Sequence, residues 1–268
     1  MRVQLWCDME GVAGIIHWDQ VNGGAPLYQE ARRLYMNEIN ACIRGCKRAG
    51  ATEIIAIDGH GAGGPWNFNS WILEHMEPGA EYVNGFRWGC YTEALASGCD
   101  ALLMPGAHAM AGTPDGVLCH TISSTNWVRA QIRMPDGSWK DVGESGLVAA
   151  IAGSLDVPAV FVSGDEATCR EAGDLLGPNV VQACVKKGLG RFSARSMSPA
   201  DACALIEEKT YEALTRRDRW PAPLKTAIPA ELRIELHTPD QANQYIGRPG
   251  VEIVDPRTVI CRGENFWK

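Results

Sequence analysis

The sequence predicts a three-layer α/β/α fold with a largely parallel or mixed sheet, arranged as two α/β lobes. Apolar runs of strand length alternate with segments of helical apolar spacing over residues 2–104, and the alternation returns over residues 144–216. A helix between two consecutive strands makes those strands parallel and lies against a face of the sheet. The alternation therefore predicts the layers before any single element is considered.

The first half of the chain supplies most of the predicted sheet. Residues 2–7 form a strand that ends at Asp8, and residues 27–49 carry apolar residues at helical spacing up to Gly50, a natural stop. The run Glu-Ile-Ile-Ala-Ile at residues 53–57 is typical of a buried parallel strand. The same reasoning predicts a helix at 69–75, a strand at 81–83, a helix at 90–97 and a strand at 101–104.

A different pattern follows in the middle of the chain. Residues 117–133 look extended, and Met-Pro-Asp-Gly at 134–137 has the composition of a tight turn. Residues 138–142 are then expected to return as the partner strand. This segment predicts a hairpin, which differs from the alternation of strands and helices in the parallel part of the sheet.

The second half returns to alternating helices and strands. Ser198-Pro199 has the residues of a helix N-cap and first turn, for a helix that ends near Arg216. We place a boundary near residue 165, between a metal-binding α/β lobe (1–165) and a smaller C-terminal α/β lobe (166–268). The other expected elements are a helix at 144–155, a strand at 159–162, a helix and a strand beyond Gly164, a Pro-rich loop at 217–230, and strands at 231–236 and 257–261.

Composition narrows the function. The 268 residues carry a formal net charge of −7, which disfavours nucleic acid as a partner. No apolar run approaches the roughly 20 residues that span a bilayer, and the N-terminus does not read as a secretory signal. The ten cysteines are irregularly spaced and form no CxxC pair, so we expect reduced thiols in a cytoplasmic protein.

Acidic and histidine side chains follow three of the predicted strands. Asp8 and Glu10 follow the first strand, Asp58 and His60 the second, and His108 the strand at 101–104. Ligands of open α/β sheets collect at the carboxyl ends of the strands. Carboxylate and imidazole donors gathered there suit zinc or a similar divalent ion. The sequence therefore predicts a metal site at this edge.

Each of these residues also has an ordinary structural interpretation. Asp58 is equally consistent with a turn or helix cap, and a lone His60 or His108 with a hydrogen-bonded surface residue. Glu144 stands in the first turn of a predicted helix, where an acid is favourable. We interpret Asp165, after the strand at 159–162, as a cap or supporting residue rather than a ligand.

Motifs of other enzyme classes are weak or missing. Residues 59–64 (Gly-His-Gly-Ala-Gly-Gly) fit the dinucleotide pattern GxGxxG, but Pro65 follows at once and a histidine occupies the loop. Cys119 and His120 are adjacent, so on a strand they would face opposite sides and not form a catalytic pair. Neither a GxSxG elbow nor a GxxxxGK[ST] phosphate loop occurs.

Five motifs, in this order and spacing, resemble the M55 family of D-aminopeptidases. The resemblance covers most of the chain and thins after about residue 220. The motifs are Cys7-Asp8-Met9-Glu10-Gly11, Asp58-Gly59-His60, Gly106-Ala107-His108, the stretch from Gly112-Thr113-Pro114 to His120, and Gly143-Glu144-Ser145-Gly146.

The resemblance implies a site, an activity and an assembly. It implies a zinc-dependent aminopeptidase that acts on short peptides with an N-terminal D-amino acid of the D-alanine type, and subunits stacked as pentameric rings into a decamer. The catalytic histidine falls on His120. The two zinc ions of the family fall on Asp8, Glu10, His60, His108 and Glu144.

Five donors exceed the three that usually hold one catalytic zinc, which fits a pair of ions. We expect Asp8 to bridge them and His120 to assist the oxyanion or the leaving amine. Two alternatives stay open: a dinuclear hydrolase of another small amide or lactam, and a non-catalytic binding protein of peptide uptake. Four tryptophans belong either to a pocket or to the core or a subunit contact, namely Trp18, Trp66, Trp71 and Trp88.

Overall fold

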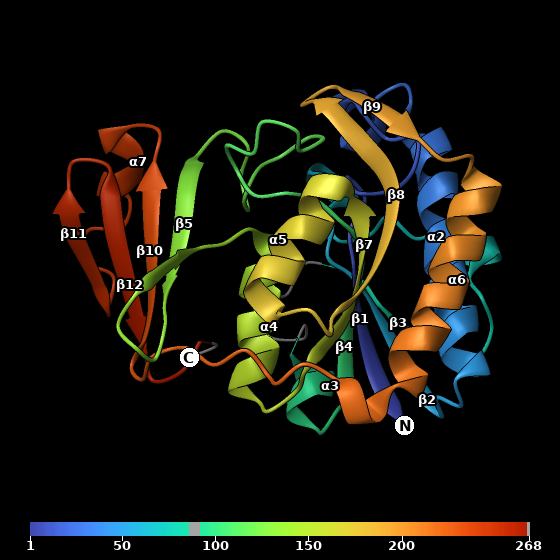
Figure 1. Ribbon diagram of the computed structural model, residues 1–268. Coiled ribbons are helices and arrows are strands. Elements are labelled where there is room, and N and C mark those ends of the chain that lie inside the picture. The colour runs from blue at the N-terminus through green and yellow to red at the C-terminus, as the bar shows by residue number, and fades with distance from the viewer. Residues whose placement is uncertain (86–91, 267–268) are drawn as a thin grey trace.

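The computed structural model describes residues 1–85 and 92–266, and it has the predicted mixed α/β architecture (Figure 1). A seven-stranded sheet forms its centre, and every pair of neighbours is parallel except the last, β8 with β9. The strand order is β3 (Glu81–Val83), β2 (Glu53–Asp58), β1 (Arg2–Cys7), β4 (Ala101–Ala107), β7 (Ala159–Asp165), β8 (Val181–Gly190) and β9 (Ser193–Ser196).

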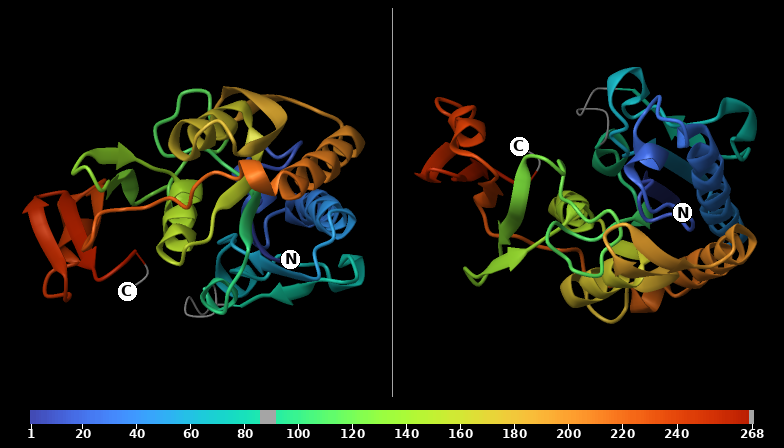
Figure 2. Two further views of the ribbon diagram at one scale, coloured as in Figure 1. Left: turned by 60° about the horizontal axis from the view of Figure 1, so that its bottom comes forward. Right: turned by 90° about the horizontal axis from the view of Figure 1, so that it is seen from above.

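Helices cover both faces of this sheet (Figures 1 and 2). On one side, α2 (Tyr28–Arg48) and α6 (Pro199–Thr215) form the first outer layer. On the opposite side, α4 (Glu144–Ser154) and α5 (Glu166–Leu176) form the second. The three-layer prediction is confirmed.

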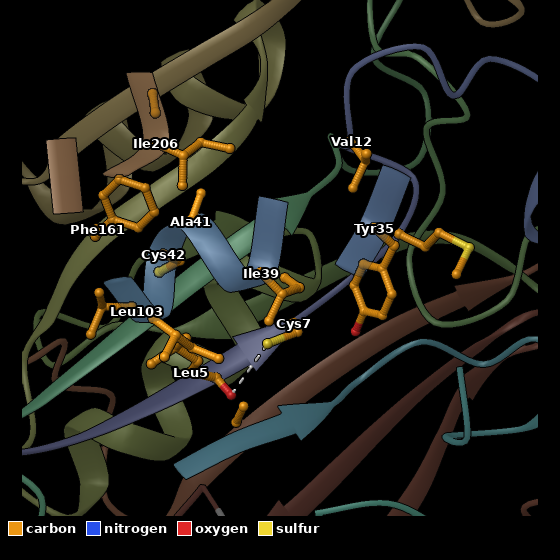
Figure 3. Close-up of a cluster of buried hydrophobic side chains, with 14 of the residues drawn as sticks. Leu5, Cys7, Val12, Tyr35, Ile39, Ala41, Cys42, Leu103, Phe161 and Ile206 are labelled. Atoms are coloured by element: carbon orange, nitrogen blue, oxygen red, sulfur yellow. Dashed lines mark hydrogen bonds between the residues drawn. The ribbon is translucent and has the colours of Figure 1, made fainter. Parts of the chain in front are cut away.

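Alternate residues of the central strands divide the core between the two faces. Leu103 belongs to the cluster under α2 and α6, whereas its neighbours Leu102 and Met104 belong to the cluster under α4 and α5. Successive side chains of a strand point to opposite faces, so a strand covered on both sides must be apolar throughout. Figure 3 shows Leu103 and Phe161 packed against side chains of α2 and α6.

A second sheet of five antiparallel strands stands beside the first (Figure 1). It contains the expected hairpin and the last strands, and its short helix α7 (Pro239–Asn243) packs Ala242 against Ile234 and Val259. The order is β11 (Val251–Asp255), β12 (Thr258–Gly263), β10 (Ala230–Leu236), β5 (Trp127–Arg133) and β6 (Trp139–Asp141).

The pairing of strands divides the chain differently from a cut at residue 165. That position lies between β7 and β8, which are parallel neighbours in the large sheet. The small sheet instead draws its strands from residues 127–141 and 230–263. We therefore propose that the lobes follow the two sheets, with the β5–β6 hairpin inserted between β4 and α4.

Several local predictions differ from the structure. The helix expected at 69–75 is only the turn η2 (Leu73–His75), because side chains take its backbone groups: Asp58 accepts the Ser70 N–H, and Arg32 donates to the Ser70 carbonyl at 2.9 Å. The first two residues of the helix expected at 90–97 lie outside the described residues. Within the described part of this range, the helix is α3 (Glu93–Ala96).

Short elements without a strong apolar period were not predicted. These are α1 (Trp18–Val21), η1 (Gly64–Trp66), η4 (Arg217–Arg219), α7, β9 and β11. The predicted cap of α6 is confirmed, since the Ser198 side chain accepts the Asp201 N–H. In the part of the chain that the structure describes, no helix has the length and apolarity to cross a bilayer.

Candidate metal centre

The candidate site lies where the chain reverses its direction of travel across the large sheet. From β1, the chain builds β2 and β3 on one side, and then β4 and β7 on the other. Such a switch point leaves a crevice at the carboxyl ends of the strands. Asp8 and Glu10 follow β1, His60 follows β2, and His108 follows β4.

Two glycines let the segments after β1 and β4 touch. A Cβ on Gly11 would lie 1.9 Å from the Ala107 carbonyl oxygen, and one on Gly106 would lie 1.9 Å from that of Asp8. Gly106 also has a φ of +77°, which residues with a side chain rarely adopt. The Gly11 N–H donates to the Gly106 carbonyl at 2.8 Å. This contact brings Asp8 and Glu10 beside His108.

The Asp8 carboxylate lies between two imidazoles. Its Oδ1 is 3.3 Å from Nδ1 of His60, and its Oδ2 is 3.3 Å from Nε2 of His108. Glu10 Oε2 joins the first histidine at 3.0 Å, and Glu144 Oε1 joins the second at 3.2 Å. All five residues predicted as metal ligands are therefore in one cluster, with Asp8 at its centre.

Backbone carbonyls fix which nitrogen of each histidine faces the cluster. A carbonyl only accepts, so the ring nitrogen beside it carries the proton. Nε2 of His60 donates to the Val21 carbonyl at 2.8 Å, and Nδ1 of His108 donates to that of Ala109 at 3.0 Å. In the neutral rings, the nitrogens that face Asp8 are then unprotonated lone pairs.

This arrangement fits a metal cation. Lone pairs of imidazole and carboxylate repel each other at about 3 Å unless a cation lies between them. Among the described residues, Glu10 Oε2 and His108 Nε2 also make no hydrogen bond, although both are buried. Groups of the right atoms lie within 4.8 Å of one another, namely Asp8, Glu10 and His108, and His108, His120 and Glu144.

The electrostatics of the cluster point the same way. Burial and the neighbouring Glu10 raise the pKa of Asp8 to about 7. Burial would lower the pKa of His60 and of His108, but Glu10 and Asp8 beside His60, and Glu144 and Asp8 beside His108, raise both pKa values well above the usual range. Without a metal ion, a proton would lie between each acid and its imidazole, at the position that a divalent ion would otherwise occupy.

His120 stands at the edge of the cluster in a strained loop. Its ring stacks on His108 at 4.0 Å between centroids, its Nδ1 donates to the Leu118 carbonyl, and its Nε2 is 3.5 Å from Glu144. Leu118 and Ile122 have φ values of 51° and 60°, a region costly for branched side chains. The Ile122 N–H donates to Glu144 at 2.7 Å, so both unusual residues position the site.

Burial, and then the neighbouring His108, lower the pKa of His120. The ring is therefore neutral, and its unprotonated Nε2 faces the site. That state suits a group that takes up and returns a proton. The same nitrogen is also close enough to Glu144 to act as a ligand, so position alone assigns His120 to neither role.

Three buried residues, Lys186, Asp58 and Asp165, support the ligand loops, and sequence patterns did not single out Lys186. Lys186, on β8, donates from Nζ to the carbonyls of Glu10, Val12 and Ile15 at 2.6, 2.8 and 2.7 Å. Burial lowers its pKa to about 8. Its three N–H groups thus fasten the loop that carries Asp8 and Glu10.

Asp58, whose role was left open, acts as a turn residue. Its Oδ1 accepts from the Tyr35 hydroxyl at 3.0 Å and from the His60 N–H at 3.2 Å, so it holds the His60 loop against α2. Asp165 caps α5 through the Thr168 N–H, as expected. Its other oxygen accepts from the Val117 N–H at 2.6 Å, which anchors the loop leading to His120.

The competing motifs have structural explanations. The glycine loop at 59–64 leads into the three-residue turn η1, not into the N-terminus of a long helix that would face a pyrophosphate. Cys119 packs against Ala109 and Ala167, while both ring nitrogens of His120 face other groups. Trp71 is buried in the core and Trp18 meets His120 edge-on, whereas Trp88 lies outside the described residues.

A cavity of about 390 Å³ opens beside His120. One wall is the loop 111–114 after β4, and another is Trp127 and Val128 of β5 in the small sheet. Arg191 and His237 also line it. Its volume is in the range of small-molecule sites, so it suits a short substrate rather than a folded protein.

The chain is similar to known D-aminopeptidases over its whole length. The profile of the M55 family, described as D-aminopeptidase, matches residues 1–268. A D-aminopeptidase of Bacillus subtilis (strain 168) is 32% identical over 261 residues, which span 97% of this chain and 90% of the relative.

The fold is also similar to a solved structure. That structure is described as the Zn-dependent D-aminopeptidase DppA from Bacillus subtilis, a self-compartmentalizing protease. The TM-score is 0.90 at 31% identity, and the match covers 99% of this chain and 93% of the other. Likeness in sequence and in fold thus extends over both sheets.

Proposed function

The chain belongs to the M55 family of D-aminopeptidases, and we propose that it is a zinc-dependent aminopeptidase that hydrolyses short peptides with an N-terminal D-amino acid, of the D-alanine type. The observation that carries the proposal is the Asp8 carboxylate, which presents one oxygen to each of two histidines. A carboxylate so placed is suited to bridge two cations.

We assign two zinc ions to each subunit. Asp8, Glu10 and His60 would hold one ion, and Asp8, His108 and Glu144 the other. Zinc, when bound, supplies a water molecule acidified to a pKa of roughly 7 and polarises the scissile carbonyl. The backbone carbonyls behind His60 and His108 keep the correct ring nitrogen toward the ions.

The chain's own contribution to proton transfer falls to His120. Its neutral ring would take a proton at Nε2 from the water that adds to the scissile carbonyl and give it to the nitrogen of the departing amine as the C–N bond breaks, while the Leu118 carbonyl holds Nδ1. The stacked His108 ring and the Glu144 carboxylate limit its movement. The cavity beside His120 would receive the part of the peptide that leaves.

We further propose a cytoplasmic homo-oligomer, a decamer of two pentameric rings. The solved relative is described as self-compartmentalizing, and this chain exposes large apolar side chains such as Leu73, Ile228 and Ile246, each at least 66% exposed. The described cysteines are free thiols, as in a reducing compartment. A mass ten times 29.1 kDa by light scattering would support the decamer, and a monomer would contradict it.

The deciding experiment measures zinc content and peptide hydrolysis on one sample, stripped with a chelator and reloaded. We expect two zinc ions per chain, and cleavage of D-Ala-D-Ala in preference to L-Ala-L-Ala. Two ions without cleavage of either dipeptide would keep the site and reject the substrate class. No bound zinc and no activity restored by zinc would reject both.

A further inference from the structure

The cavity beside His120 contains one permanent charge. Of the described residues that line it, only Arg191 is ionised at all ordinary pH values, and no acidic side chain is among them. Arg191 lies in the turn between β8 and β9, and it is exposed. The cavity of this acidic protein therefore presents a single permanently cationic side chain.

Aromatic rings hold the Arg191 side chain at the cavity. Its guanidinium carbon lies 5.5 Å from the ring of Trp18 and 5.6 Å from that of Phe192. Among residues 1–85 and 92–266, no carboxylate forms an ion pair with it. A guanidinium that lies beside aromatic rings and has no carboxylate partner keeps N–H donors for a ligand, and two parallel N–H donors match a carboxylate.

The Trp18 ring also links Arg191 to the proposed chemistry. It meets the ring of His120 edge-on at 5.5 Å between centroids. His120 and Arg191 therefore both contact the ring of Trp18. Both also line the one cavity. Glu144 lies beside Nε2 of His120, so His120 stands between the candidate metal ligands and the cavity.

We propose that this cavity binds the leaving part of the substrate and that Arg191 binds its C-terminal carboxylate. The inference rests on the proposed function, in which His120 protonates the departing amine. Whatever follows that nitrogen must then lie beyond His120, on the side of the cavity. Arg191 thereby selects short peptides with a free C-terminal carboxylate.

Chain geometry limits the length of the leaving part. In a dipeptide, the carboxyl carbon is roughly 2.5 Å from the departing nitrogen, and each added residue extends the reach by at most about 3.6 Å. His120 and Arg191 each lie 5.5 Å from the centre of the Trp18 ring, so the His120 ring centre and the guanidinium carbon are at most about 11 Å apart. One or two residues after the scissile bond therefore fit, and a long chain would have its carboxylate elsewhere.

The test compares free acids with their C-terminal amides, using D-Ala-D-Ala, D-Ala-D-Ala-D-Ala and the amide of each. The variant is Arg191→Met, with Arg191→Lys to restore the charge. Arg195→Met is the matched control, because Arg195 is an exposed arginine of the neighbouring strand β9 that does not line the cavity. The Arg191 carbonyl, which accepts from the Leu118 N–H at 2.8 Å, stays in every variant.

We expect Arg191→Met to reduce kcat/KM for the acids on the order of tenfold, mainly through KM, with a much smaller loss for the amides. Arg191→Lys should recover part of the preference for acids, and Arg195→Met should keep it. An acid-to-amide ratio unchanged in Arg191→Met at both lengths would overturn the subsite. A wild-type protein that cleaves none of the four peptides would overturn the proposed function, and the subsite with it.

Discussion

The two sheets differ in where their charged residues lie. Around the large sheet, six charged side chains are buried among the described residues: Asp8, Glu10, Glu38, Asp58, Asp165 and Lys186. In the strands of the small sheet, the only buried polar residue is Thr258. The small sheet keeps its charges in surface ion pairs, such as Arg129 with Asp141 and Arg262 with Glu231.

The large sheet carries the candidate metal centre, whereas the small sheet contributes one side of the cavity. A buried charge costs several kcal/mol unless a partner or a metal compensates it. The buried charges of the large sheet include acids beside the histidines of the candidate metal centre. The strained residues Leu118 and Ile122 lie in the loop that carries His120. The small sheet lines the cavity with Trp127 and Val128, and neither contribution buries a charge. Substitutions should therefore act very differently in the two regions.

Removing a candidate ligand should have the largest effect. His108→Ala removes the imidazole between Asp8 and Glu144, so zinc content should fall and activity should drop by several orders of magnitude. His60→Ala should also lower zinc content. Metal analysis and dipeptide hydrolysis are the measurements, with His75→Ala, at an exposed histidine outside the cluster, as the control. Full zinc retention in both variants would reject the assigned site.

His120→Ala should separate proton transfer from metal binding. We expect turnover to fall by a factor on the order of 10² to 10⁴ while the zinc content stays at the wild-type level. Stoichiometry by metal analysis, together with kcat, checks both parts. If zinc is lost with activity, His120 is a ligand; if activity stays within twofold, it has no part in the reaction.

Lys186→Met should loosen the metal loop from behind. The change removes the Lys186 ammonium from the carbonyls of Glu10, Val12 and Ile15, so we expect a loss of about 3–5 kcal/mol in the free energy of unfolding. Zinc affinity should fall by about 10- to 100-fold, as when groups behind a ligand are removed. Urea unfolding and competition with a zinc chelator measure the two effects.

The next residue offers the control for that variant. Lys187 is half-exposed and pairs with Glu166 at 3.0 Å on the surface. Lys187→Met should cost less than about 1 kcal/mol and leave zinc affinity unchanged. Equal effects of the two lysines would mean that the buried ammonium has no special hold on the loop.

The sequence predicted four of the six residues of the candidate site more directly than the other two. Asp8, Glu10, His60 and His108 each stand within four residues of a buried strand, and parallel strands end at a common edge. Local pattern and topology therefore suffice to bring them together. Glu144 and His120 came from the family resemblance, because an acid in a first helical turn and a histidine in a loop have ordinary explanations of their own.

Long-range contacts mark the limit of sequence reasoning. Lys186 lies 176 residues from Glu10, and nothing in the pattern of β8 indicates that its ammonium crosses to another loop. The small sheet was missed for a similar reason: β5 and β10 lie about a hundred residues apart in sequence and meet only in the fold. Short strands such as β9 and β11 carry too few residues for a period to be recognised.

Glu38→Gln should reveal one buried charge through pH. Burial raises the pKa of Glu38 to about 7 from its ordinary value of 4.5, so the folded protein binds more protons than the unfolded chain between these values. The free energy of unfolding of the wild type should then decline as pH rises from 4.5 to above 7. The glutamine variant lacks the part of this decline that comes from Glu38.

We expect Glu38→Gln to be more stable than the wild type by about 1–3 kcal/mol at pH 8, with little difference near pH 4.5. Its side-chain carbonyl still accepts from the Ala13 N–H, as Oε1 of Glu38 does at 2.8 Å. Urea unfolding of both proteins across this pH range is the measurement. A stability difference that does not change with pH would show that the Glu38 charge is compensated.

The smallest effect should come from the small sheet. Arg129 binds Asp141 with two hydrogen bonds, of 2.6 and 2.9 Å, but both side chains are more than 40% exposed, so water screens the pair. Arg129→Met should therefore cost less than about 1 kcal/mol, keep the zinc content and leave kcat unchanged. Thermal unfolding and dipeptide hydrolysis at two salt concentrations measure this, because an exposed pair weakens further with salt. A loss as large as that of Lys186→Met would mean that surface charges of the small sheet also hold the fold together, and the contrast between the two sheets would fail.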